Sequence, residues 1–554
     1  MNEIKLYKID LQRMLYSKLS MKPYLGKRGY SIYKESLSTQ ELDKVKKELT
    51  VKPFVPKSSV PMKAFPIYRE SSQKLYVPRY YGFDKFTIPD DIRVPCGMDL
   101  GEGISFKGSL RDYQNTISDK FVASAHELGG GLLEVDTGLG KTVIALNIIT
   151  RLKKKTLIIV HKEFLMDQWI ERIGEFIPTA RVGKIQGKKI EIDDKDICIG
   201  MLQSLSMKDY ESNLFDSFGF TIIDEVHHLG AEVFSQALSK IITTYALGLS
   251  ATMERKDGLT KVFKMFMGPI VHTEKRDTKG ATIFVKVVEY QNDDEEFSQV
   301  KHDYRGNPMY SSMITKLCAY THRTEMILNV LKYLRTSQPA QQVMILAHNK
   351  SILTYLHDAI KERNIASVGY YVGGMRKEAL KESESKQVIV ATYSMASEGL
   401  DIKSLASLIM ATPKTDIVQT VGRILRAPHD EPTIVDIVDQ HDLFRRQYSQ
   451  RKRFYMKQKY EITKANGSEF RETNQNINWK TLNASKSRGD YANKTSTHKQ
   501  IQKQKHSILD HVKIFANDES KTDLSAFGDA ISEDDDLDEV QKTPKCLISF
   551  SDLY

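Results

Sequence analysis

A short glycine-rich segment that also holds a lysine and a threonine is the part of the chain that most directly indicates chemistry. It reads VDTGLGKT over residues 135–142, after an apolar run at 132–135 and before a helical stretch at 143–151. Glycines let backbone N–H groups turn toward an anion, and the start of the helix adds its dipole. Lys141 would reach the β- and γ-phosphates of a nucleotide, and Thr142 would offer its hydroxyl to Mg²⁺. The predicted phosphate-binding residues are Asp136, Thr137, Gly138, Leu139, Gly140, Lys141 and Thr142.

Two carboxylates follow a second apolar run, at 221–223. Asp224 would hold the metal ion, and Glu225 would position or deprotonate the attacking water. The alternative is an acidic turn that caps a helix, and the shared sheet with the phosphate loop argues against it. His227 and His228 come next, but adjacent histidines cannot share one helix face and no nearby cysteine completes a zinc site. We therefore assign His227 a polar bridging role and His228 none.

The spacing of the apolar runs predicts that two successive α/β domains, residues 106–275 and 276–465, position these groups. In both, β-rich runs alternate with helical stretches, which is typical of βαβ units and a parallel sheet. The predicted strands are 132–135, 156–160, 197–201, 220–223 and 246–249 in the first domain, and 282–289, 343–347, 388–391, 408–411 and 433–437 in the second.

Residues 1–105 are predicted to form a small, separate, basic module with short strands. The first 100 residues hold 19 Lys and Arg against 11 Asp and Glu. Such a surface can follow phosphates and stack bases. A tyrosine-rich core with solvated lysines is an equally good interpretation. The tyrosines concerned are Tyr24, Tyr30, Tyr33, Tyr76, Tyr80 and Tyr81.

The other end, residues 466–554, is predicted to be a low-complexity, largely disordered tail. It is rich in Asn, Lys, Ser and Thr, and residues 529–539 hold seven carboxylates. Such a composition buries too little apolar surface to offset chain entropy. The acidic run either competes for the protein's basic surface or aids solubility. Just before the tail, residues 441–460 hold seven Lys and Arg, with Phe444, Tyr448 and Tyr455 on one helical face. That face is expected to dock on the second domain, and a duplex-binding role is the alternative.

Composition limits the class of protein. The chain has 554 residues, of which 40% are hydrophobic, and a formal net charge of +10. It is therefore neither wholly disordered nor membrane-embedded. Its N-terminus has no secretory pattern, and its four scattered cysteines support neither a disulfide framework nor a cysteine zinc site. We expect an intracellular protein that does not act at a membrane.

The motifs, taken in order, resemble those of superfamily 2 helicases of the DExH type over roughly residues 105–455. TGLGKT, DEVHH, SAT at 250–252 and QTVGRILR at 419–426 carry the resemblance, together with LRDYQ at 110–114, IIVHKEFLMDQW at 158–169, GMLQSL at 200–205 and ATYSMASEGLDI at 391–402. The layout is similar to XPB-type helicases, the phage UvsW helicase and the transcript-release helicases of large DNA viruses. Two positions depart from the patterns: Val135 replaces a glycine, and Lys256 replaces the acid of an Arg-Glu-Asp triplet.

The resemblance implies two RecA-like domains with ATP and Mg²⁺ between them. It implies that Glu225 handles the water, that Arg423 and Arg426 stabilise charge on the γ-phosphoryl group, and that Gln419 contacts the γ-phosphate. The same resemblance gives Gln114 as the reader of adenine, Asp224 and Thr142 as the Mg²⁺ ligands, Gly399 and Asp401 as the closing residues of the nucleotide side, Ser250 and Thr252 as a relay, and Thr392 as a nucleic-acid phosphate contact.

The function predicted is ATP-driven movement along, or unwinding of, a nucleic-acid duplex, with DNA favoured, in viral transcription, repair or recombination. The alternatives are an RNA helicase, a duplex translocase that does not separate strands, and a nucleic-acid-binding scaffold with an inactive ATPase. Transcription or replication proteins are candidate partners of the N-terminal module or the tail. If the source is a large DNA virus, the virion or the viral replication site is the expected location.

Overall fold

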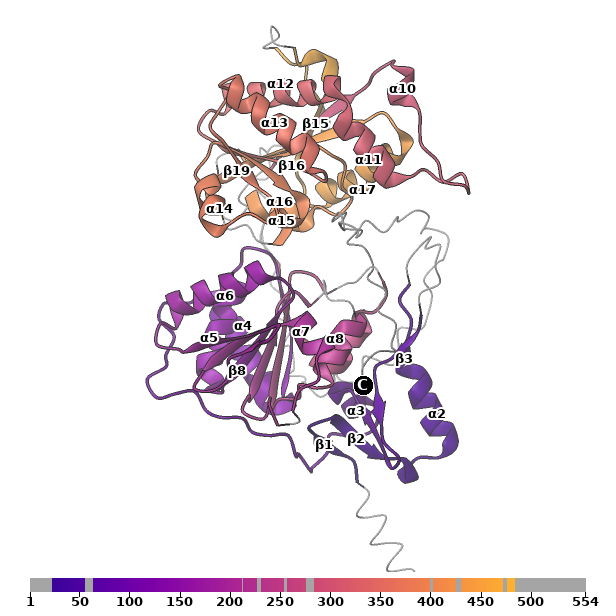
Figure 1. Cartoon of the computed structure of the whole chain (residues 1–554), viewed down its shortest axis with the longest axis vertical. Coiled ribbons are helices and arrows are strands. Elements are labelled where there is room, and N and C mark those ends of the chain that lie inside the picture. The colour runs from indigo at the N-terminus through magenta and orange to yellow at the C-terminus, as the bar shows by residue number, and fades with distance from the viewer. Residues whose placement is uncertain are drawn as a thin grey trace, which may run out of the picture.

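The computed structural model describes residues 22–54, 63–211, 213–226, 231–253, 257–275, 283–398, 402–424, 429, 431–471 and 476–483. Two large α/β domains, one above the other in Figure 1, are each built on an eight-stranded sheet, and a smaller N-terminal unit lies beside the lower one. Helices cover both large sheets, so the chain has the two tandem RecA-like parallel-sheet domains predicted from the sequence.

The first large sheet has the strand order β10-β9-β11-β8-β12-β13-β7-β14, and all its pairs are parallel except β10 with β9. Every residue of the central strands β8 and β12 is buried. Such continuous apolar runs are expected where helices cover both faces of a parallel sheet. The strands are β7 (Gly130–Val135), β8 (Thr156–Val160), β9 (Val182–Gln186), β10 (Lys189–Ile190), β11 (Ile197–Met201), β12 (Phe220–Ile223), β13 (Tyr245–Ser250) and β14 (Ile270–Glu274). The helices are α4 (Asp112–Leu128), α5 (Lys141–Leu152), α6 (Glu163–Phe176), α7 (Leu202–Met207), α8 (Ala231–Leu238) and α9 (Thr260–Met267).

The second large sheet repeats this plan with the order β17-β18-β16-β19-β20-β15-β21-β22. Only β21 with β22 is antiparallel, and that pair continues the sheet past residue 465, the predicted end of the domain. Residues 484–554, most of the predicted tail, lie outside the described residues. The strands are β15 (Phe284–Tyr290), β16 (Gln342–Ala347), β17 (Val368–Tyr371), β18 (Val388–Thr392), β19 (Leu405–Met410), β20 (Thr433–Asp439), β21 (Glu461–Asn466) and β22 (Lys480–Asn483). The helices are α10 (Glu295–Ser298), α11 (Tyr310–Ala319), α12 (Thr321–Ser337), α13 (Lys350–Glu362), α14 (Lys377–Glu384), α15 (Tyr393–Glu398), α16 (Val418–Ile424) and α17 (Asp442–Lys457).

The N-terminal unit is an antiparallel four-stranded sheet, β1-β2-β6-β5, with helices α2 and α3 and a short β3-β4 pair. Its apolar side chains belong to the same buried cluster as those of the first domain. The buried Arg79 also donates to the carbonyls of Thr243 (2.5 Å) and Thr244 (3.0 Å). The N-terminal unit therefore has a sheet of its own but shares its buried core with the first domain. The elements are β1 (Tyr24–Gly26), β2 (Gly29–Tyr33), α2 (Thr39–Glu48), β3 (Thr50–Val51), β4 (Phe65–Pro66), β5 (Arg69–Glu70), β6 (Lys74–Val77) and α3 (Arg79–Lys85).

Helix α17 docks as expected on the second domain. Phe444 is fully buried in one apolar cluster of the domain and Tyr455 in another, and Tyr448 packs at the edge of the cluster that holds Tyr455. Among the described residues, no helix combines the length and the apolarity needed to cross a bilayer.

Candidate nucleotide-binding site

The phosphate loop lies at the carboxyl end of β7, where ligands of parallel sheets usually bind. The loop runs from Asp136 to Gly140, and α5 begins at Lys141. Gly138 and Gly140 both have φ of +86°, in the left-handed region that favours glycine. A Cβ at residue 140 would lie 2.4 Å from Nε2 of Gln114, so this position also lacks room for a side chain. The loop therefore needs its glycines for conformation and, at one of them, for space.

Gln114, the predicted adenine reader, supports the phosphate loop directly. Its Nε2 donates to the carbonyl of Leu139 at 2.9 Å, and its Oε1 accepts from the backbone N–H of Arg111 at 3.0 Å. The hydroxyl of Tyr113 donates to the same Leu139 carbonyl at 3.1 Å. The start of α4 is thereby tied to the loop, and any contact of Gln114 with a base would be transmitted to the loop predicted to hold the phosphates.

The predicted lysine and the predicted catalytic glutamate form an ion pair. Nζ of Lys141 lies 3.0 Å from Oε1 of Glu225, and the two side chains are 11% and 19% exposed. Glu225 has a φ of +49°, which is uncommon for a residue with a side chain. Two sequence segments more than 80 residues apart thus meet at one edge of the sheet, and both side chains remain partly exposed.

Asp224 lies deeper than Glu225. It is 7% exposed, and the indole Nε1 of Trp169 donates to its Oδ2 at 2.9 Å. Burial, followed by the neighbouring Glu225 carboxylate, raises the pKa of Asp224 to about 6. A bound cation would reverse this effect, because opposite charge favours the ionised carboxylate. The burial of Asp224 beside a second carboxylate is the electrostatic setting expected of a metal ligand.

The donor set fits Mg²⁺ in the way nucleotide-binding proteins hold it. No group of three or more His, Cys, Asp or Glu side chains that could bind a metal occurs in the described part of the chain. Mg²⁺ usually takes one or two protein oxygens and completes its shell with water and nucleotide phosphates. The hydroxyl of Thr142 and the carboxylate of Asp224 would supply those protein oxygens.

Helix α16 of the second domain contacts the phosphate loop of the first. A Cβ built on Gly422 would lie 3.2 Å from Cβ of Thr137 and 3.5 Å from its Cγ2. A second contact between the domains joins Lys377 of α14 to Asp167 of α6, with Nζ 2.6 Å from Oδ2. The segment that carries the predicted Gln419 and Arg423 therefore lies across the loop predicted to bind phosphate.

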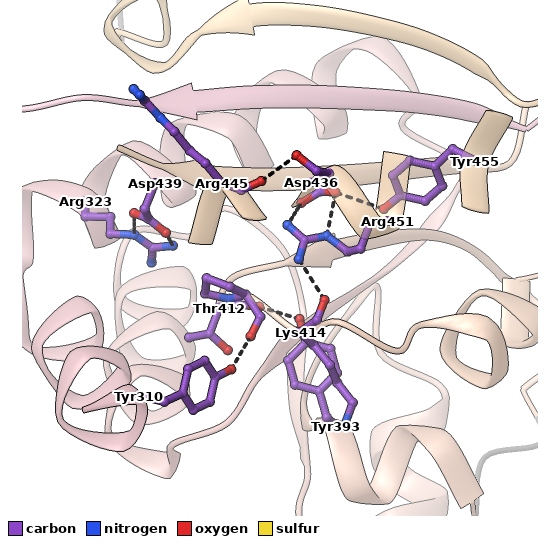
Figure 2. A network of polar contacts seen from close by, with 12 residues as sticks. Tyr310, Arg323, Tyr393, Thr412, Lys414, Asp436, Asp439, Arg445, Arg451 and Tyr455 are labelled. Atoms are coloured by element: carbon purple, nitrogen blue, oxygen red, sulfur yellow. Dashed lines mark hydrogen bonds and ion pairs between the residues drawn. The ribbon is translucent and has the colours of Figure 1, made fainter. Parts of the chain in front are cut away.

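Three side chains hold the loop that leads into α16 (Figure 2). Three consecutive carbonyls accept one hydrogen bond each: Thr412 from Tyr393 (2.6 Å), Pro413 from Tyr310 (2.9 Å) and Lys414 from Arg451 (2.7 Å). The donors come from α15, α11 and α17, so three helices fix one short loop. We call this set, residues 310, 393 and 451 with the carbonyls of 412–414, the carbonyl clamp.

Two buried ion pairs lie behind the clamp. Arg451 makes a two-pronged contact with Asp436 of β20 at 2.8 and 2.9 Å, and the hydroxyl of Tyr455 donates to the same carboxylate at 2.9 Å. Arg323 contacts Asp439 in the same way, at 2.5 and 2.8 Å. Burial alone would lower the pKa of Arg451, but the charge of Asp436 more than offsets this and the pKa is raised. Both arginines therefore stay charged in the interior.

The motifs expected to face nucleic acid lie at the carboxyl ends of the strands. Nε2 of Gln203 donates to the carbonyl of His161 at 3.0 Å, which joins the 158–169 and 200–205 motifs. Thr392 ends β18, with its hydroxyl 3.3 Å from that of Ser394. Ser250 is buried, and its Oγ accepts from the N–H of Thr252 at 3.2 Å. These contacts order the motifs, and the phosphate and relay roles stay predictions.

Several predicted residues cannot be placed. Gln419 and Arg423 lie in α16, but their side chains are outside the described part of the chain. The residues wholly outside it are His227, His228, Arg255, Lys256, Gly399, Asp401 and Arg426. Trp169 and Tyr393 lie in predicted motifs, but the contact of Trp169 with Asp224 and the carbonyl clamp were not predicted. One signal was available: Arg451 stands on the aromatic face of α17, and Asp436 interrupts an otherwise apolar strand.

The chain is similar to several known proteins. Residues 107–255 match the family model for the type III restriction enzyme res subunit. A protein of Acanthamoeba polyphaga mimivirus, named "Putative ATP-dependent RNA helicase", is 36% identical over 80% of this chain and 87% of its own length. A protein of the same name from African swine fever virus is 29% identical over 65% of this chain and 75% of its own length. Among solved structures, T4 UvsW is similar at 19% identity and a TM-score of 0.30, over 78% of this chain and 96% of the phage protein.

Proposed function

Because this chain belongs to the ATP-dependent superfamily 2 helicases, we propose that it couples ATP hydrolysis between its two RecA-like domains to movement along, or unwinding of, a nucleic-acid duplex. The contact between Gly422 and Thr137 carries this proposal. It brings the helix with the candidate arginine against the loop with the candidate lysine, as a site shared by two domains requires.

In this mechanism the nucleotide replaces the ion pair between Lys141 and Glu225. Lys141 turns from the carboxylate to the phosphates, and Glu225 is released to orient a water molecule for in-line attack. Mg²⁺, held by Thr142 and Asp224, would neutralise charge on the phosphates. Arg423 and Arg426 approach from the second domain, and a guanidinium in this role is typically worth about 10³–10⁵ in rate. Hydrolysis then weakens the closed arrangement and lets the domains part.

The polynucleotide we favour is DNA, because the motif layout resembles XPB-type and UvsW-type helicases. RNA is the second candidate, because the viral relatives carry the name RNA helicase. The contacts expected from the 158–169, 200–205 and 391–402 motifs are to the sugar–phosphate backbone, so binding should depend steeply on salt and weakly on sequence.

The test is ATP turnover measured with single-stranded and duplex DNA and with single-stranded and duplex RNA, together with strand separation. Stimulation by duplex DNA, absent for RNA, is expected. If RNA alone stimulates ATP turnover, the polynucleotide on which the protein acts is RNA and not DNA. Equal turnover with and without every polynucleotide would contradict the coupling itself, and Lys141→Ala serves as the inactive control.

A further inference from the structure

The N-terminal sheet presents one face to the core and a different face outward. Along its strands the side chains alternate, as the pleat requires. The inward face is apolar, with Leu25, Tyr30, Ile32, Leu75 and Val77 at most 4% exposed. The residues of the opposite face are paired across the strands as Tyr24 with Ser31, Tyr76 with Ser31, Tyr33 with Lys74, and Arg69 with Tyr76, and Ser31 is buried beneath its neighbours. Figure 1 shows β1 and β2 of this sheet beside α3, at the side of the first domain.

The outward tyrosines are interleaved with cations. Nζ of Lys74 lies 5.0 Å from the ring centre of Tyr24 and 4.6 Å from that of Tyr33. The guanidinium of Arg93 lies 4.1 Å from the Tyr24 ring, and that of Arg28 lies 5.4 Å from the Tyr76 ring. Lys74 also donates to the Tyr24 hydroxyl at 3.1 Å, which raises the pKa of the lysine and keeps it charged. We call the tyrosines 24, 33 and 76 with the cations 28, 69, 74 and 93 the tyrosine face.

Positive charge on this face exceeds the carboxylates that answer it. Asp91 pairs with Arg93 at 2.5 Å, yet the Arg93 side chain stays 55% exposed. Glu70 forms ion pairs with Lys34 and Lys46, which are not among the cations of the face.

Arg28 and Arg69 are held close to each other. Both line a cavity of about 80 Å³ with Tyr76 and with residues of α8, in the seam to the first domain. Burial, followed by the charge of Arg28, lowers the pKa of Arg69, while Asp209 acts in the opposite direction. Holding two like charges together costs free energy that a bound anion would recover.

We infer that the tyrosine face binds single-stranded nucleic acid, with phosphates on its arginines and lysine and unpaired bases against its rings and guanidinium planes. Partly exposed aromatic rings that alternate with cations suit a strand whose bases are free to stack, since every base has a π-face. A duplex hides its bases and would use only the charges. An acidic peptide would bind the cations of the face, but its carboxylates would make no stacking contact with the three rings. The choice of this polyanion rests on the proposed function.

The face would act as an anchor apart from the motor. The cavity at its edge is also lined by Ser235, Gln236 and Ser239. Ser235 and Gln236 lie in α8, and Ser239 directly follows it; α8 is the first described helix after the Asp224 and Glu225 pair. A strand held there would lie close to the motor domain without occupying its motifs.

The experiment measures binding of a labelled oligo(dT) and a labelled oligo(U) by the full chain, without nucleotide, over a range of salt. Arg28→Gln with Lys74→Gln should weaken binding at least tenfold and reduce the salt slope by about 1.4, because two phosphate contacts are lost. Tyr33→Thr with Tyr76→Thr should weaken binding at least about fivefold and leave the slope unchanged, because stacking is lost. ATP turnover without polynucleotide should match the wild type in both.

A matched control exists in the second domain, where the guanidinium of Arg305 lies 5.0 Å from the exposed ring of Tyr304. Tyr304→Ser with Arg305→Gln should bind as the wild type does. Equal losses in the control, or wild-type affinity and slope in both face variants, would overturn the inference. Tighter binding of a duplex through the face would also overturn it.

If the tyrosine variant does not fold, ultraviolet cross-linking of an iodouracil-labelled strand to the wild type replaces it. Cross-links in residues 22–33 or 74–78 are expected, and cross-links confined to the two large domains would contradict the inference. Binding by the face without any stimulation of ATP turnover would contradict the proposed function and leave the inference standing. If polynucleotide stimulates ATP turnover but the face variants bind it as the wild type does, the inference is contradicted and the proposed function stands.

Discussion

Both large domains contain pairs of opposite charges beside their parallel sheets, but the two domains expose those pairs to different degrees. In the first domain Lys141 and Glu225 face each other at 3.0 Å and both remain partly exposed. In the second domain Arg451 with Asp436, and Arg323 with Asp439, are at most 1% exposed. The first pair can be opened by a ligand, whereas the buried pairs cannot open without leaving a charge in the interior.

Under the proposed function, this difference separates the groups that would take part in hydrolysis from the groups that hold other residues in place. A pair whose lysine must move to a phosphate has to be accessible to the nucleotide, and opening the pair must cost little free energy. A pair that fixes a loop has to stay closed. A buried pair stays closed because opening it would leave an unpaired charge in the desolvated interior. In the proposed two-domain site the second domain would contribute α16. The position of α16 depends on the loop before it, which the carbonyl clamp holds.

The largest effect should follow from breaking the accessible pair. Glu225→Gln should lower ATP turnover by at least about a hundredfold, because the water loses its orienting carboxylate. ATP affinity should be kept, since Lys141 is then free for phosphate. Steady-state turnover with nucleotide binding by fluorescence checks this. Wild-type turnover in this variant would remove Glu225 from its role.

Breaking the buried pair should instead cost stability. Arg451→Met leaves Asp436 charged and buried, and such a loss is typically about 3–5 kcal/mol of unfolding free energy. Calorimetry should show the second domain unfolding at a lower temperature while the first is unchanged. Arg451→Lys should recover part of the loss. An unaltered unfolding profile for Arg451→Met would show that the pair is not what holds the clamp.

The contact between α16 and the phosphate loop can be tested by adding a side chain to it. Gly422→Val would push against Thr137, and a displacement of about 1 Å near a reacting group can cost up to about a hundredfold in rate. The melting temperature should stay nearly constant. Gly373→Val is the matched control, because a Cβ at that glycine of the same domain has nothing within 4 Å. Equal turnover in the two variants would contradict the closed arrangement.

A smaller effect is expected from a single member of the carbonyl clamp. Tyr393→Phe leaves the Thr412 carbonyl without this donor, which costs about 1–3 kcal/mol. Turnover should fall severalfold at saturating ATP with little change in KM, because the loop and α16 are less well fixed. Tyr355→Phe, at an exposed tyrosine bonded to Glu325, should change neither. A fall only in ATP affinity would place Tyr393 elsewhere in the mechanism.

The smallest effect should come from removing residues 484–554, which follow the last described strand of the second sheet. Their polar composition, with its acidic run at 529–539, is expected to bury little apolar surface. Basal ATP turnover and melting temperature should match those of the full chain. A collapse of either would show that this segment completes the fold.

The sequence by itself determined the architecture and the order of the motifs, because both are written in local patterns. The fully buried strands β8 and β12 are found where the apolar runs predicted them, since burial on both faces demands unbroken apolar residues. Strands nearer the sheet edges, such as β9 and β17, alternate buried and partly exposed residues. Their weaker signal was missed for that reason.

Only the tertiary structure decided which distant groups meet. Arg451 looks like one of many basic residues on a surface helix until Asp436 and the Lys414 carbonyl are placed around it. Likewise, the N-terminal tyrosines divide between core and surface: Tyr30, Tyr80 and Tyr81 are buried, and the members of the tyrosine face are not. Residue type and spacing fix what a segment can do, but the partner that satisfies a buried charge comes from another element. No local pattern encodes that pairing.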